Sequence, residues 1–303
     1  MTATNRLQRE GAEIDYATHG RDDGVPLLLV MGLGMQRTAW PESLLDAFVR
    51  QGFRCISFDN RDIGLSTRYD EHGVPPLHRV IAARLLRRPY RTPYTLADIA
   101  DDGMAVLDAL GIEHAHVLGM SMGGMIAQHI ASRHGPRLQS LTLMSTSSGR
   151  LGLPLPSSTV LQLMLSRPNQ RISLDAATTY LVRLFSAIGS PNFPTPREEM
   201  VRRARDSILR APTGSGVARQ LAAIISDGDR TPMLRKLAVP TLVMHGTHDA
   251  MVPLAHGRHL ASVIPGARLH TIRGWGHDLP DVLSTDIARV VAQHARPVAP
   301  ATP

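Results

Sequence analysis

The sequence predicts an α/β protein built on a doubly wound, mostly parallel sheet with an inserted group of helices. Short apolar runs alternate with longer segments of helical spacing over residues 1–147, and this alternation returns over 236–295. The intervening residues 148–235 carry helical patterns and no strand pattern. Alternating strands and helices are typical of a parallel sheet with right-handed crossovers. We therefore expect one core domain in two parts, with a helical cap inserted between them.

The first part of the core contains alternating predicted strands and helices. The run VPLLLVMG (25–32) is almost wholly apolar, which is typical of a strand covered on both faces. Thr95 is a suitable N-cap for one helix, and Gly52 and Gly111 follow helical segments at positions that favour a stop. The predicted strands are 25–32, 53–59, 114–120 and 138–146, and the predicted helices are 38–52, 95–111 and 121–135.

The helices of the cap and the elements of the second part of the core are predicted from the same kinds of sequence signal. Turn signals such as GSPNFPTP (189–196) and RPNQ (167–170) separate the helical segments of the cap. Those segments are 157–166, 173–188, 196–211 and 215–227. The second part of the core then supplies predicted strands at 239–246 and 267–274 and helices at 253–264 and 281–294. The Pro/Ala-rich end, 296–303, is predicted to be a disordered tail.

Composition and charge limit the classes of function. The 303 residues are 43% hydrophobic and 19% charged, as in an ordinary globular protein, and the net charge is +7. No zinc-finger or RNA-binding signature accompanies the scattered arginines, so no nucleic-acid partner is expected. The densest basic group, in the segment 79–91, is predicted to be a solvated helix face, although an anionic partner or a membrane surface stays open. The group consists of Arg79, Arg84, Arg87, Arg88 and Arg91.

Targeting and redox signals are sparse. Cys55 is the sole cysteine, so no internal disulfide can form. The first twenty residues lack the apolar core of a secretory signal, and no run is long enough for an integral membrane segment. A cytoplasmic protein is expected by default, and self-association into a homo-oligomer is left open.

The stretch GMSMG (119–123) matches the G-x-S-x-G pattern between a predicted strand and a predicted helix. A sharp strand–turn–helix would lift the Ser121 side chain clear of the sheet edge, and glycine at both ends avoids crowding in that turn. The alternative is that Ser121 merely caps the helix. A serine nucleophile needs a base and a group that orients the base, so the choice depends on residues elsewhere in the chain.

The base is predicted to be His277. It follows the predicted strand 267–274 in the glycine-rich loop RGWGHDLP, at the sheet edge where open α/β sheets bind ligands. Most other histidines fall within predicted helices or strands, where a structural role is expected. Asp278, the next residue, is a weaker candidate for the orienting acid, because adjacent side chains rarely face each other.

The acid is predicted to be Asp249, which follows the strand 239–246 in the loop GTHDAMVP. The loop after the strand 138–146 reads STSSGR and offers no carboxylate. A metal site formed by His245, His248 and Asp249 is the less favoured interpretation, because no HExxH pattern or second carboxylate cluster accompanies it. We therefore expect a metal-free and cofactor-free site.

Acyl transfer also needs two donors for the developing oxyanion. The backbone N–H of Met122 follows the nucleophile, and the backbone N–H of Leu33 lies in the loop MGLGMQ (31–36) after the first predicted strand. Gly32 and Gly34 give that loop its conformational freedom. Together with Ser121, these two N–H groups complete a set of parts suited to hydrolysis of an acyl group.

Five segments of the chain match the pattern of a known family. They are LLLVMGLG (27–34), FDNRDIGLST (58–67), LGMSMGGMIAQ (118–128), MHGTHDAMVP (244–253) and IRGWGHDLP (272–280). On these, nearly the whole chain resembles the α/β-hydrolase superfamily, in particular bacterial esterases related to aclacinomycin methylesterase and the 3-oxoadipate enol-lactonases. The resemblance implies the α/β-hydrolase fold, and the order Ser121, Asp249, His277 is that family's nucleophile–acid–base order.

The chain departs from the commonest family pattern at Met31. Most relatives have a histidine before the glycine of the oxyanion loop, whereas this chain has Met31–Gly32. Backbone donors do not need that histidine, but its polar contacts are lost, so we expect packing alone to orient the loop. Asp59, Arg61 and Asp62 are predicted to form structural ion pairs and to take no part in catalysis.

These observations predict a serine hydrolase of the carboxylesterase type that acts on a small or medium apolar ester. Candidate substrate-binding residues are Met31, Gly32, Met120 and Phe185. The same triad could instead serve a lactonase, a C–C bond hydrolase or a cofactor-free perhydrolase. A ligand-binding protein of the same fold without turnover is the remaining alternative, and it fits less well with a complete triad.

Overall fold

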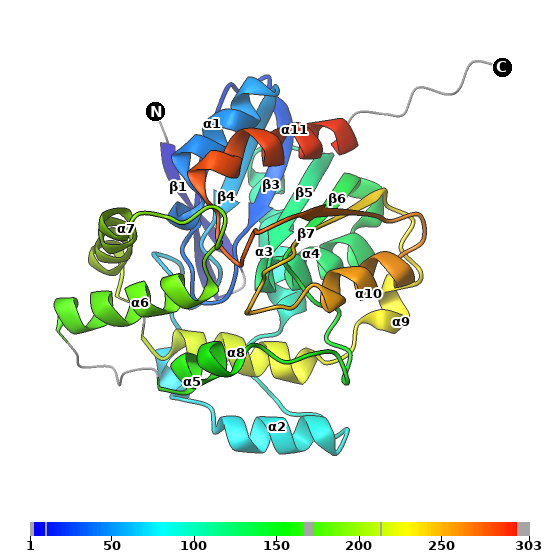
Figure 1. Cartoon of the computed structure of the whole chain (residues 1–303). Helices are drawn as coiled ribbons and strands as arrows, with labels where there is room; N and C mark the ends of the chain where they lie inside the picture. The colour runs from blue at the N-terminus through cyan, green and yellow to red at the C-terminus, as the bar shows by residue number, and fades with distance from the viewer. Residues whose placement is uncertain (1–2, 10, 167–172, 213, 296–303) are drawn as a thin grey trace.

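The computed structural model describes residues 3–9, 11–166, 173–212 and 214–295, and its centre is an eight-stranded sheet (Figure 1). The strand order is β1-β2-β4-β3-β5-β6-β7-β8, and pairing is parallel from β4 to β8 and antiparallel in β1–β2 and β2–β4. The strands are β1 (Ala3–Arg9), β2 (Ala12–His19), β3 (Val25–Val30), β4 (Phe53–Phe58), β5 (Ala115–Met120), β6 (Leu138–Met144), β7 (Thr241–Gly246) and β8 (Arg268–Ile272). The predicted mostly parallel sheet is therefore confirmed.

Two of these strands, β1 and β2, are absent from the sequence prediction. They form an antiparallel hairpin at the edge of the sheet, joined at Gly11, whose φ of +78° is readily adopted by glycine. β1 has the sequence ATNRLQR and contains no apolar run. An edge strand with one neighbour needs few apolar residues, so the signal that identified the central strands is missing here.

Helices cover both faces of the sheet (Figure 1). On one side lie α1 (Glu42–Arg50) and α11 (Ser284–Ala295), and on the other lie α3 (Leu96–Ala109), α4 (Met122–Arg133) and α10 (Ala255–Val263), with the short α9 (Thr231–Leu234) nearby. Thr95 caps α3 as predicted, in a reciprocal capping box with Asp98. Short 3₁₀ helices occur at Arg37–Ala39, Asp70–His72, Gly135–Arg137 and Asp281–Leu283.

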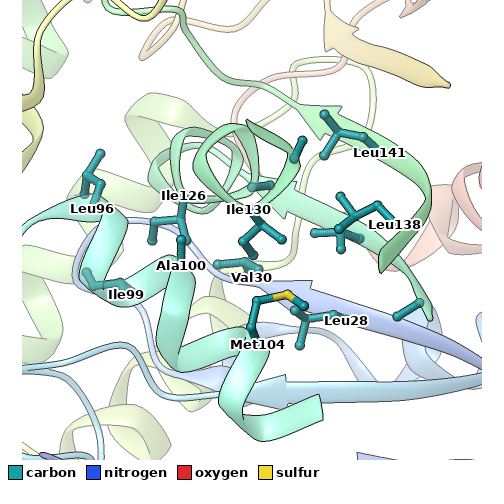
Figure 2. Close-up of a cluster of buried hydrophobic side chains, with 14 of the residues drawn as sticks. Leu28, Val30, Leu96, Ile99, Ala100, Met104, Ile126, Ile130, Leu138 and Leu141 are labelled. Atoms are coloured by element: carbon teal, nitrogen blue, oxygen red, sulfur yellow. The ribbon is translucent and has the colours of Figure 1, made fainter. Parts of the chain in front are cut away.

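Two apolar clusters hold these layers together. Leu28 and Val30 of β3 point toward α3 and α4, where they pack among side chains such as Met104 and Ile126 (Figure 2). The alternate residues, Leu27 and Leu29, belong to the second cluster, beneath α1 and α11. This alternation is expected of a strand buried on both faces.

The predicted helical segments between residues 148 and 235 all fold as helices. They are α5 (Ser158–Leu165), α6 (Leu174–Ile188), α7 (Arg197–Arg210) and α8 (Gly216–Asp227), and α2 (Leu77–Leu85) packs against α8. Hydrogen bonds join this group to loops at the carboxyl ends of strands. Ser157 N–H donates to the Ala250 carbonyl after β7, and His277 N–H after β8 donates to the Ile188 carbonyl at the end of α6.

The predicted turn 167–170 and the predicted tail 296–303 lie outside the described residues. Within the described part of the chain, no helix has both the length and the apolar character needed to cross a lipid bilayer.

Candidate active site

Ser121 lies between β5 and α4 in a strained backbone conformation. Its φ is +56° and its ψ is −122°, a region that side chains rarely adopt and that costs about 1–3 kcal/mol. Its N–H donates to Met144 O at 2.9 Å and its carbonyl accepts from Thr146 Oγ1 at 2.6 Å, so the end of β6 fixes the turn. Ser121 occupies the N-cap position of α4, but its side chain makes no capping hydrogen bond, so its hydroxyl does not act as a helix cap.

The glycines around Ser121 are required by close backbone contacts. A Cβ atom on Gly119 would lie 2.2 Å from Gly123 O, and one on Gly123 would lie 1.9 Å from Val30 O. At Gly124 a Cβ atom would lie 2.6 Å from the Thr146 side chain. Real Cβ atoms do not approach so closely, so the turn demands glycine for the steric reason that the sequence suggested.

Asp249 and His277 form a buried pair, and both are less than a tenth exposed. Asp249 Oδ2 accepts a hydrogen bond from His277 Nδ1 at 2.8 Å. The other oxygen, Oδ1, accepts from the backbone N–H groups of Met251 at 3.0 Å and Val252 at 2.7 Å. Burial opposes ionisation of Asp249, but the charge of His277 and its hydrogen bond outweigh burial and lower the pKa of the carboxyl below its ordinary value.

The competing roles for neighbouring residues do not match the geometry. Asp278 Oδ1 accepts from Ser190 Oγ at 2.5 Å, so this carboxylate is occupied by a residue beyond the end of α6. His245 Nε2 donates to the Val252 carbonyl at 2.7 Å, and burial lowers the pKa of its imidazole. Among the described residues, no group of three histidine, cysteine or acidic side chains has the arrangement of a metal site.

The three predicted triad residues follow three parallel strands at the same edge of the sheet. Ser121 follows β5, Asp249 follows β7 and His277 follows β8. Parallel strands present their carboxyl ends together, so the fold directs these loops toward one site. His277 uses Nδ1 for Asp249, and no described protein group bonds to its Nε2. Nε2 therefore has no described protein partner, as the predicted role of His277 as the base requires.

The oxyanion loop lies directly beside Ser121. A Cβ atom on Gly32 would lie 3.1 Å from Ser121 Cβ and 3.7 Å from its Oγ. The described structure gives the N–H groups of Leu33 and Met122 no acceptor within the protein. Met122 is the first residue of α4, where the helix dipole also favours negative charge. Neither predicted donor is therefore occupied within the described structure, and their role in holding an oxyanion stays a prediction.

The presence of Met31 led us to expect that packing alone orients this loop. That expectation is wrong, because polar contacts also hold the loop. Asn60 Nδ2 donates to Met31 O at 2.9 Å. Gln220 of α8 accepts from Gly34 N–H at 2.9 Å and donates to Arg61 O at 2.9 Å. Gln36 Nε2 donates to the carbonyls of Ser207 and Ala211 at the end of α7. Helices α7 and α8 thus supply contacts that no local sequence signal indicated.

Replacing Gln220 by Met is expected to lower kcat about tenfold, with less change in KM. The substitution leaves Arg61 O buried without a partner, which costs about 1–3 kcal/mol, and removes the acceptor of the half-buried Gly34 N–H, which loosens the predicted oxyanion loop. Steady-state kinetics and thermal unfolding would check this. The matched control is Gln128→Met, because Gln128 is equally buried and makes two polar contacts away from the loop. Equal losses of kcat in both variants would contradict a role in positioning the loop.

The predicted ion pairs of Asp59, Arg61 and Asp62 are present, but their partners come from distant segments. Asp59 pairs with Arg210 of α7, and Asp62 pairs with Arg219 of α8, each with contacts of 2.7 Å. Arg61 pairs with Asp102 of α3 at 2.6 Å. The first two pairs attach α7 and α8 to the core, consistent with a structural role.

The candidate substrate-binding residues differ in exposure. Met31 and Met120 are buried in the apolar cluster beneath the site, while Phe185 of α6 is half-buried. Gly32 is buried beside Ser121. A surface hollow of about 790 Å³ is lined by none of these four, and it lies near Leu138, at the amino end of β6.

The chain is similar to known proteins over most of its length. The chain is 28% identical to rhodomycin D methylesterase DauP of Streptomyces sp. (strain C5), over 89% of this chain and 91% of that protein. It is 23% identical to 3-oxoadipate enol-lactonase 2 of Acinetobacter baylyi, over 88% and 87%. The esterase RhEst1 from Rhodococcus sp. ECU1013 shares the fold at a TM-score of 0.74 and 20% identity, over 96% of this chain and 98% of that one. The model of the alpha/beta hydrolase fold matches residues 25–282, so the chain belongs to the α/β hydrolase family.

Proposed function

We propose that this protein is a serine hydrolase of the carboxylesterase type that forms an acyl-enzyme on Ser121. The observation that carries the proposal is the buried Asp249–His277 pair, joined at 2.8 Å, at the sheet edge where Ser121 stands in its strained turn. A serine hydroxyl alone is a poor nucleophile, and this pair supplies both the base and the group that orients it.

The proposed reaction has two halves. In the first, His277 Nε2 takes the proton of Ser121 Oγ, which attacks the ester carbonyl, and the N–H groups of Leu33 and Met122 stabilise the oxyanion. His277 then donates the proton to the departing alcohol. In the second half, His277 activates a water molecule that releases the acid. Asp249 holds the imidazole in the required tautomer throughout and stabilises its charged form.

The substrate is proposed to be a small or medium apolar ester. One relative is named as a methylesterase, which supports a small alcohol as the leaving group. The second candidate is a lactonase, which the likeness to an enol-lactonase favours and which needs the same triad. We further propose that residues 148–235 act as a cap, since α6 and α8 contact the loops that carry His277 and the oxyanion donors.

Labelling with a fluorophosphonate would test the proposal. We expect the folded protein to react at Ser121, as read by mass spectrometry of the modified peptide, and the label to block hydrolysis of p-nitrophenyl acetate. A panel of methyl esters, enol-lactones and a peracid assay would then separate the esterase from its alternatives. A folded protein that fails to react at Ser121 would refute catalysis by this residue.

A further inference from the structure

Helix α2 presents an apolar face that no described residue covers. Val80 is fully buried and anchors the helix, whereas Ile81, Leu85 and Leu86 are 46%, 65% and 66% exposed. Ile81 and Leu85 are four residues apart, so their side chains lie on the same side of the helix. The helix lies beneath the cap helices, at the opposite end of the molecule from α1 and α11 in Figure 1.

Unpaired positive charge flanks this apolar face. Residues 72–97 contain five arginines and no acidic residue. Four of them, Arg79, Arg87, Arg88 and Arg91, are exposed and have no carboxylate partner in the described structure. Many other arginines are neutralised within the protein, as in the buried pair of Arg219 with Asp62. A cluster of uncompensated positive charge thus lies at the same place as the exposed leucines.

Arg87 occupies a position that favours glycine. Its φ is +53°, and the bonds Arg88 N–H to Ala83 O and Arg87 N–H to Arg84 O close the end of α2 in a Schellman arrangement. Glycine would adopt this conformation without strain. An arginine there destabilises the helix end while adding a further charge to the exposed face. Strain retained at an exposed position points to a role outside folding.

We propose that α2 is a docking element that holds the protein on the surface of an anionic lipid bilayer. In this arrangement Ile81, Leu85 and Leu86 enter the boundary between headgroups and acyl chains, and the four arginines contact the anionic headgroups. A basic helix with an apolar face has the chemistry that such surfaces bind. The protein would lie on the bilayer without spanning it, with its cap helices next to the lipid.

The observations favour a lipid surface over two other occupants. A second copy of the chain, docked by two-fold symmetry, would bring two uncompensated arginine clusters together, which is repulsive. Nucleic acid would need aromatic side chains or base-reading groups among the arginines, whereas the exposed face of α2 carries aliphatic side chains. An anionic bilayer can pair its headgroups with the arginines and also take up the apolar side chains.

Vesicle sedimentation would test the proposal. We expect the full chain to bind vesicles of phosphatidylcholine with about one third phosphatidylglycerol, and to remain free with phosphatidylcholine alone. NaCl at about 1 M, where charges are screened within about 3 Å, should release it. Arg87→Gly should weaken binding about fivefold, and joint replacement of Arg79, Arg87 and Arg88 by Gln about a hundredfold. Leu85→Asp should also weaken it.

Arg87→Gly distinguishes a loss of vesicle binding from a loss of stability. Glycine relieves the strained φ, so the melting temperature should stay unchanged or rise. Arg50→Gln is the matched control, since Arg50 is exposed at the end of α1 and has no carboxylate partner among the described residues. Ser121→Ala should bind as wild type does, so the result does not depend on catalysis. Absence of binding to anionic vesicles, equal losses with Arg50→Gln, or a dimer in solution that buries α2 would each overturn the proposal.

Discussion

Replacing Ser121 by Ala is expected to lower kcat for p-nitrophenyl acetate by about ten-thousandfold to a millionfold. The variant keeps the Cβ atom and the turn but removes the oxygen that becomes acylated. Asp249, His277 and the oxyanion donors stay in place, so residual hydrolysis comes only from water oriented by those groups. Steady-state kinetics would measure the loss, with circular dichroism to show that the fold is kept.

Ser145 provides a matched control for this experiment. It is also a serine with a positive φ, +45°, and it lies directly after β6, fully buried. Its Oγ has no hydrogen-bond partner in the described structure. Ser145→Ala should therefore retain wild-type kcat. If both variants keep activity, or if both lose it, Ser121 is not specifically the nucleophile.

The central strands and the loops after them could be predicted because their signals are local. The run 25–32 is apolar throughout most of its length since β3 is buried on both faces, and the glycine at 119 is required by a close contact with Gly123 O within the same turn. Because parallel strands end at one edge, the positions of Asp249 and His277 after β7 and β8 were sufficient to associate them. Their contact at 2.8 Å matches that expectation.

The support of the oxyanion loop could not be predicted in this way. Gly34 and Gln220 are separated by 186 residues, and nothing near Gln220 distinguishes it from a solvent-facing glutamine of a helix. The same holds for Arg210 and Arg219, which pair with Asp59 and Asp62 in the segment 58–67. Such contacts depend on how α7 and α8 pack on the core. The spacing of apolar residues along the chain does not predict that packing.

Replacing Asp249 by Asn is expected to lower kcat by about ten-thousandfold, because the two carboxylate oxygens face different partners. Oδ1 accepts from two backbone N–H groups, those of Met251 and Val252. An asparagine must therefore keep its carbonyl oxygen there and turn its NH₂ toward His277. His277 Nδ1 would then have to accept a hydrogen bond, which moves the ring proton to Nε2 and leaves no base for the serine.

The neighbouring side chains cannot replace Asp249. His245 lies 3.5 Å from its Oδ2, but it already donates to the Val252 carbonyl. Asp278 is held by Ser190, and burial raises the pKa of its carboxyl. Asp278→Asn is thus the matched control and should keep most of the activity. Nitrogen-15 NMR of the His277 ring would report the tautomer directly. Retention of the Nδ1 proton in Asp249→Asn, with activity within about tenfold of wild type, would show that the orienting acid is another residue.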